Sequence, residues 1–133
     1  MQRSGGCQCG AVRYQISGDA LYVALCHCRD CQRSAGAPNV VWAAFNEAQF
    51  AVIAGDAKTV NLTGDSFRSF CSDCGTGLYF RNQTVLPGLV DVQAVTFDDP
   101  SAFPPGAHIQ YAERQRWMDG ADALHKFERY LPG

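Results

Sequence analysis

The segment "CSDCG", residues 71–75, decides how this chain folds, because its two cysteines are spaced to hold one metal ion. Two intervening residues let the backbone turn until both sulfurs point at the same metal, and the glycine that follows can adopt the positive φ that this turn requires. The segment "CQCG", residues 7–10, also has a glycine directly after a cysteine pair. Residues i and i+2 of an extended chain face the same way, so this pair can chelate a metal as well.

A third segment, "CHCRDC" at residues 26–31, holds three cysteines and brings the total to seven. An odd number leaves one thiol over in any scheme made only of disulfides, and short spacing favours metal binding or catalysis. Four thiolates close a structural zinc site, whereas three leave one coordination position open. The cysteines therefore divide into a group of four and a group of three.

Two divisions fit the spacing. In the first, the C-x-x-C of residues 28–31 pairs with that of residues 71–74, as in a zinc ribbon, and three cysteines remain at distant points. In the second, "CQCG" pairs with "CSDCG", which leaves residues 26–31 as a compact triad and ties the N-terminus to the middle of the chain. The four-cysteine site is then Cys7, Cys9, Cys71 and Cys74. The triad is then Cys26, Cys28 and Cys31.

Two simpler interpretations compete with this one. The cysteines could be small buried hydrophobic residues, as free cysteine often is. The triad could also hold a second structural zinc closed by a protein ligand, for which His27, Asp30 and His108 are the candidates. Of these, His27 is the least suitable, because in an extended segment it faces away from its two cysteine neighbours.

Short apolar runs separated by turn residues predict a mainly β domain that spans residues 1–133. In the run 11–16, alternation places Val12, Tyr14 and Ile16 on one face. The other expected strands are 21–28, 39–45, 50–55, 58–62, 67–71, 77–82, 89–97 and 107–113. A helical turn is expected at 29–34, no regular element at 100–106 because of its prolines, and irregular structure after 113.

Composition narrows the possible partners. The net charge is −2 and the basic residues are scattered, so no basic face for nucleic acid is expected. No apolar run reaches the length of about 18 residues that spans a membrane, and no export signal is recognised. We therefore expect a cytoplasmic protein with reduced thiols and no membrane partner, while the oligomeric state stays open.

The motifs "GGCQCGAVRY", "CHCRDCQRSAG" and "CSDCGTGLYF", in this order, resemble those of the glutathione-dependent formaldehyde-activating (GFA) family, whose domain also occurs in centromere protein V. The resemblance runs from about residue 3 to the C-terminal "DALHKFERYLPG". It implies an Mss4-like fold of stacked antiparallel sheets, a structural zinc at the four-cysteine site and a second zinc at the triad. It also implies a carbon–sulfur lyase that condenses formaldehyde with glutathione. This chain is shorter than the founding enzymes of the family.

The open position at the triad suggests a mechanism. A small thiol, glutathione or a similar one, would enter it and bind as thiolate, which makes the three triad cysteines the catalytic residues. Nearby side chains that could shape the place are Arg29, Arg33, Ser34 and Gly36, with Asp30 the nearest candidate for a general base. The alternative is a non-enzymatic zinc module that binds a protein or nucleic acid. A thiol redox protein would need a βαβ context that the sequence does not indicate.

Overall fold

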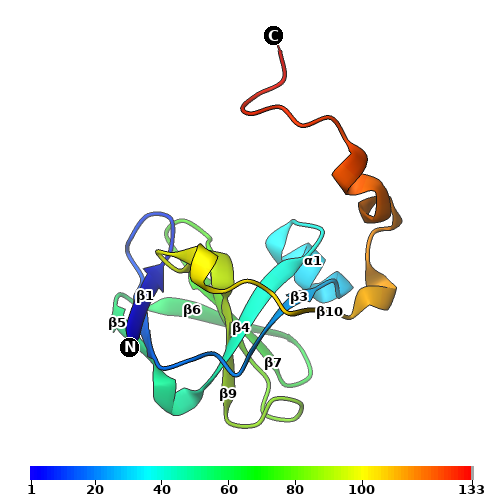
Figure 1. Cartoon of the computed structure of the whole chain (residues 1–133). Coiled ribbons are helices and arrows are strands. Elements are labelled where there is room, and N and C mark those ends of the chain that lie inside the picture. The colour runs from blue at the N-terminus through cyan, green and yellow to red at the C-terminus, as the bar shows by residue number, and fades with distance from the viewer. Residues whose placement is uncertain (133) are drawn as a thin grey trace.

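Two stacked sheets form the protein, as the computed structural model shows for residues 1–132 (Figure 1). The smaller sheet has the order β1-β2-β5. Its strands are β1 (Gln2–Gly6), β2 (Arg13–Ser17) and β5 (Phe50–Ala54). The larger sheet has the order β10-β3-β4-β9-β8-β7-β6. Its strands are β3 (Tyr22–Cys26), β4 (Val40–Asn46), β6 (Ala57–Thr63), β7 (Ser66–Cys71), β8 (Gly77–Arg81), β9 (Leu89–Gln93) and β10 (Ala107–Ile109). The mainly β, Mss4-like architecture is thus confirmed.

The core lies between the two sheets. Val12, Tyr14 and Ile16 are buried on one face, as their alternation predicted. They pack against the inner face of the larger sheet, whose buried residues include Phe45 and Val92. Aromatic rings extend this core to the segment after β9, where the Phe97 and Phe103 rings stack with centroids 4.2 Å apart.

Unlike the apolar inner face, the outer face of the larger sheet also carries polar and charged residues. One row of directly paired residues crosses it from β3 to β6, namely Tyr22, Ala44, Asp91, Phe80, Arg68 and Val60. Directly paired residues share a face, and so do residues two or four apart on one strand, which adds Cys26 and Trp42 to it. Helix α1 (Arg29–Ala35) covers the β3–β4 end of this face through Cys31.

Several predicted elements needed correction. Strand β1 was not expected, because "QRSGG" lacks apolar alternation; the pairing with β2 makes it a strand. The strands predicted at 21–28 and 89–97 end early, at Cys26 and Gln93, where α1 and a 3-10 helix (Ala94–Thr96) follow.

The segment after β9 differs from the prediction in two places. A 3-10 helix at Pro100–Ala102 interrupts the segment predicted to have no element, and the strand predicted at 107–113 shrinks to β10, which pairs in parallel with β3. Gln110, with φ of 51°, ends it, and a 3-10 helix follows at Tyr111–Glu113.

The C-terminal segment lies away from the sheets (Figure 1). It contains a 3-10 helix at Arg116–Ala123, where irregular structure had been expected. The helices found in residues 1–132 are all too short or too polar to cross a bilayer. The single domain over residues 1–133 stays a prediction, and residue 133 lies outside the described residues.

Candidate metal centres and the adjoining cleft

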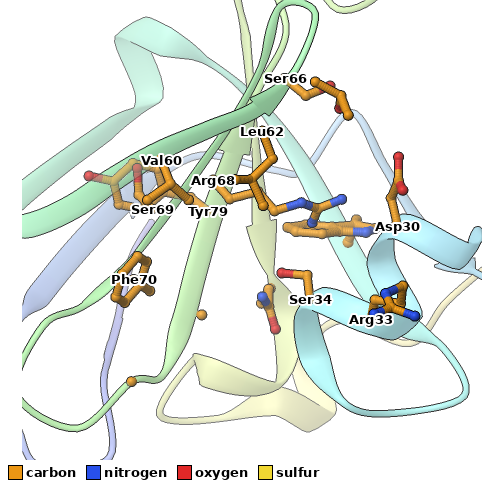
Figure 2. Close-up of a pocket in the computed structure, with 15 residues that line it drawn as sticks. Asp30, Arg33, Ser34, Val60, Leu62, Ser66, Arg68, Ser69, Phe70 and Tyr79 are labelled. Carbon is orange, nitrogen blue, oxygen red and sulfur yellow. The ribbon is translucent and has the colours of Figure 1, made fainter.

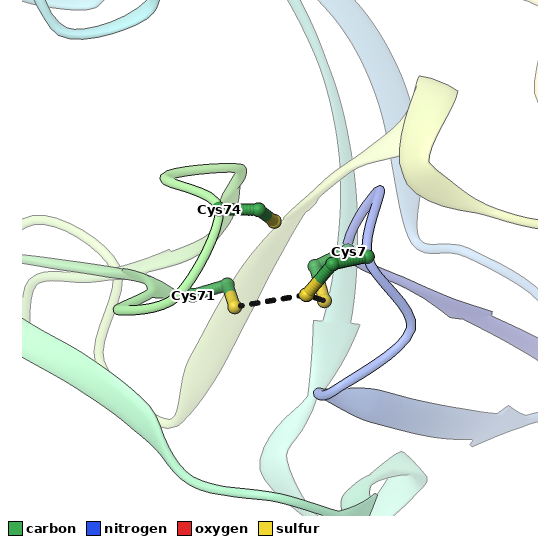
Figure 3. Close-up of side chains that lie close together, drawn as sticks. Cys7, Cys71 and Cys74 are labelled. Carbon is green, nitrogen blue, oxygen red and sulfur yellow. Dashed lines mark hydrogen bonds between the residues drawn. The ribbon is translucent and has the colours of Figure 1, made fainter.

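The structure brings "CQCG" and "CSDCG" together. Cys7 and Cys9 follow β1, Cys71 ends β7, and Cys74 lies in the turn before β8. Their four sulfurs all lie within 4.8 Å of one another. Figure 3 shows the side chains of Cys7, Cys71 and Cys74 directed at the same small space from two different loops.

The sulfur separations fit a tetrahedral metal site. The distance between Cys7 Sγ and Cys9 Sγ is 3.6 Å, and that between Cys9 Sγ and Cys71 Sγ is 3.8 Å. Zinc–sulfur bonds of about 2.3 Å in a tetrahedron place the sulfurs about 3.8 Å apart, whereas a disulfide needs about 2.05 Å. The seven cysteines are all free thiols. The donor set and its spacing therefore suit a structural zinc ion.

The backbone around this group has the predicted turns. Gly10 and Gly75 have φ of 81° and 82°, and their N–H groups donate to the carbonyls of Cys7 and Cys71. Sequence reasoning missed Thr76, whose Oγ1 accepts a hydrogen bond from the Gln8 N–H and lies 3.2 Å from Cys74 Sγ. Hydrogen bonding to Thr76 lowers the pKa of the Cys74 thiol to about 5, which favours the thiolate that a metal requires.

The triad is equally compact. Cys26 ends β3, Cys28 caps the N-terminus of α1, and Cys31 lies in its first turn. The Cys31 N–H donates to Cys28 Sγ at 3.2 Å, and the three sulfurs lie within 4.8 Å of one another. Both Cys26 and Cys31 are buried. A metal held here would have thiolate ligands supplied by nearly contiguous chain.

Among residues 1–132, no fourth side chain of a ligand type joins the triad. The His27 ring is buried, and its Nε2 lies 2.9 Å from Nδ1 of His108, so these two candidate ligands contact each other. Burial lowers the pKa of His27 and keeps it neutral. Asp30, the third candidate, is exposed on α1.

Arg68 was not singled out by sequence reasoning, although it contacts the triad. Its Nη2 donates to Cys31 Sγ at 3.6 Å, and its guanidinium lies 5.0 Å from the centre of the Phe80 ring. Hydrogen bonds from Cys26, Cys28 and Arg68 lower the pKa of the Cys31 thiol to about 5. The one sequence signal was a lone arginine within the apolar run 67–71.

Asp91 is a second residue that sequence reasoning missed. It is a buried carboxyl on the same sheet face as Cys26, and the Tyr22 hydroxyl donates to it at 3.4 Å. Burial raises its pKa to about 6. Its sequence signal was a single acidic residue inside the apolar run 89–97.

A cleft of about 630 Å³ opens beside the triad. Trp42 and Arg68 belong to both, since Trp42 packs with Cys26 and Cys31 and also lines the cleft. Of the residues expected to shape this place, Arg33 and Ser34 line the cleft, with Asp30 beside them (Figure 2). By contrast, Arg29 and Gly36 line a separate, smaller depression.

Five aromatic residues of the larger sheet, Trp42, Phe45, Phe70, Tyr79 and Phe80, differ in their surroundings. Phe45 is buried between the sheets, and Phe80 packs against the triad cluster. The others, Trp42, Phe70 and Tyr79, line the cleft. Arg33 and Arg68 add positive charge to the cleft: neither is among the ion pairs with carboxylates found in residues 1–132, and Arg68 instead contacts Cys31 Sγ.

Fold and site together define a small, mainly β protein with two cysteine groups, of four and of three thiols, that could each hold a metal ion. The family profile for the glutathione-dependent formaldehyde-activating enzyme (GFA) matches residues 2–113, and this chain belongs to that family. The recognition made from the cysteine motifs is thus confirmed, although the matched segment ends before the C-terminal part of the chain.

Two known proteins are similar to this chain, one in sequence and one in fold. A Halomonas elongata protein named "Putative glutathione-dependent formaldehyde-activating enzyme" is 27% identical over 128 residues, which cover 90% of this chain and 81% of that protein. The crystal structure of a Rhodobacter sphaeroides protein matches with a TM-score of 0.64 and 19% identity, covering 79% of this chain and 98% of that one. At 19% identity, the likeness to the Rhodobacter sphaeroides protein shows a similar fold and nothing more.

Proposed function

We propose that this protein is a carbon–sulfur lyase that makes and breaks the bond between glutathione, or a similar small thiol, and formaldehyde or another electrophile. The observation that carries the proposal is a triad of thiols that no fourth ligand-type side chain joins within residues 1–132, next to a cleft lined by Arg33 and Arg68. Family membership and the name of the Halomonas elongata relative support an enzymatic role. The free thiols fit a reducing compartment, so we propose the cytoplasm.

The cysteine groups would hold two zinc ions with different roles. The four-cysteine site would be structural and the triad catalytic. A zinc ion at the triad would lower the pKa of an incoming thiol and thereby supply a thiolate at neutral pH.

Arg33 and Arg68 would bind the substrate through its carboxylates. Glutathione carries two carboxylates, and charge-assisted hydrogen bonds to guanidinium groups are strong and directional. Since Arg68 contacts Cys31 and also lines the cleft, a carboxylate bound there would hold the thiol close to the triad. Trp42, buried against Cys26 and Cys31, would exclude water from that side.

The reaction needs one proton to move. When the thiol adds to the aldehyde, a C–S bond forms, the carbonyl becomes a hydroxyl, and the thiol proton ends on the oxygen; cleavage is the reverse. Asp30 lines the cleft and is the candidate to carry this proton. A carbonyl adduct of this kind requires no oxidant.

The test combines metal content with exchange kinetics. Protein purified without chelator should contain about two zinc ions per chain and accelerate formaldehyde–glutathione exchange, followed by NMR, above the buffer rate. Arg68→Met should reduce this acceleration, whereas Arg129→Met, on the exposed C-terminal segment, should not. Two zinc ions without acceleration would favour the alternative, a non-enzymatic zinc module. A single zinc ion per chain would contradict the triad as a metal site.

A further inference from the structure

We propose that the electrophile joined to the thiol is a bulky apolar one, such as an aldehyde with an alkyl or aryl chain, rather than formaldehyde. This inference rests on the proposed function and concerns the substrate class of the same site. It follows from the part of the cleft that lies away from the triad.

The cleft exists because α1 covers only one end of the outer sheet face. The helix packs on β3 and β4 through Cys31, while β6, β7 and β8 continue the same face beyond it. Val60 on β6 pairs directly with Arg68 on β7, so both side chains are on this face. Figure 2 shows α1 on one side of the cleft and the side chains from β6 and β7 on the other.

The two ends of the cleft differ in chemistry. At the α1 end, Arg33 and Arg68 offer positive charge beside the triad. On the β6–β7 side the apolar lining is contributed by Val60, Leu62 and Phe70, beside the hydroxyl residues Thr63, Ser66 and Ser69. A ligand that matches both ends has an anionic part near the triad and an apolar part over β6.

Leu62 is the sharpest indication of an absent apolar partner. Its side chain is 82% exposed at the rim of the cleft and is not part of either core cluster. A single exposed leucine is ordinary, but here it continues an apolar wall formed by Val60 and Phe70. A substituent on the substrate that covers this wall would remove apolar surface from water.

The size of the cleft supports the same conclusion. Its volume of about 630 Å³ is in the range of sites that enclose drug-sized ligands. Formaldehyde adds only one carbon to a thiol and would leave the apolar wall in contact with water. A larger aldehyde adds to the thiol with the same balance of bonds and protons, and its chain would extend toward Leu62.

Stable thioethers test this without depending on turnover. Isothermal titration of the zinc-loaded full chain with S-hexylglutathione and S-methylglutathione should give a Kd at least about tenfold lower for the hexyl compound. Leu62→Asp should abolish this preference while leaving S-methylglutathione affinity within about twofold. Val85→Asp, an exposed apolar position that does not line the cleft, should keep the preference.

The outcomes separate the inference from the proposed function. Binding of both thioethers with equal affinity would overturn the apolar electrophile and leave glutathione as the thiol. A preference that survives Leu62→Asp would also overturn it, because the apolar wall would then lie elsewhere. Failure of both compounds to bind would overturn the inference and the proposed glutathione site together.

Discussion

Replacing Asp91 by asparagine should stabilise the folded chain at neutral pH. The carboxyl is 6% exposed and is hydrogen-bonded by the Tyr22 hydroxyl, and it is absent from the ion pairs found in residues 1–132. Burial penalises its charged form and raises its pKa from 3.8 to about 6. Asparagine has nearly the same shape and can accept the same hydrogen bond, but it carries no charge.

The size and sign of the effect follow from linkage. Because the folded-state pKa lies above the unfolded value, the folded state binds more protons between them, and stability falls as pH rises from about 3.8 through about 6. At about 1.36 kcal/mol per pH unit, the cost reaches at most about 3 kcal/mol by pH 7. Roughly half of it is already present at pH 5. The Asp91→Asn variant has no carboxylate at this position and therefore does not lose this stability as pH rises.

Urea unfolding of both chains between pH 5 and 8, in buffers with excess zinc, measures the effect. The pH dependence of the cysteine ligands is common to both proteins, apart from the repulsion between Cys31 and the Asp91 carboxylate, which the variant lacks and which adds to the difference. With a slope of about 1–3 kcal/mol per molar urea, the midpoint should rise at pH 7 by up to about 1–3 M. A constant difference across this range, or a less stable variant at pH 7, would refute the reasoning.

Asp98→Asn serves as a control of opposite sign. The Asp98 carboxylate accepts two hydrogen bonds from Arg13, which lower its pKa. A lowered folded-state pKa contributes stability above the unfolded value, and this contribution is lost as pH falls through the folded-state pKa. Removing the charge should therefore destabilise the chain at neutral pH rather than stabilise it.

Three further outcomes are expected. Cys74→Ser should remove the structural zinc ion and lower the melting temperature. Cys28→Ser should lose only the second zinc ion and melt near the wild-type temperature. Metal analysis and calorimetry measure these two outcomes. Gly75→Ala should lower the free energy of unfolding, measured in urea, by about 1–2 kcal/mol, because φ at Gly75 is 82°. Gly120→Ala should lower it less, because Gly120 has no positive φ; an added Cβ meets open space at both positions. A strong chelator should unfold the wild type at neutral pH, seen as loss of near-ultraviolet circular dichroism.

Much of the fold could be read from local pattern. The runs that became β2, β4 and β6 to β8 were predicted because alternating or apolar residues between turns are a local signal. Strand β1 was not, because its sequence is polar, and β10 was predicted too long because the local pattern gave no sign that pairing ends at Ile109. They are strands by virtue of pairing with β2 and β3, which lie elsewhere in the chain.

The cysteine groups show the same division between local and long-range information. Spacing alone indicated a group of four and a triad, and it predicted the positive φ of Gly10 and Gly75, because a chelating turn is built from neighbouring residues. Spacing left open which pairs join, and the fold brings "CQCG" to "CSDCG".

The surroundings of the triad were decided only by the tertiary structure. Arg68 lies on β7 and Asp91 on β9, far from residues 26–31 in the sequence. They share a face with Cys26 because the register across β3, β4, β9, β8 and β7 aligns them, and a shift of one residue would turn them to the other face. The sequence by itself therefore determined which residues could bind metal, while strand pairing determined the charge, burial and cleft that surround them.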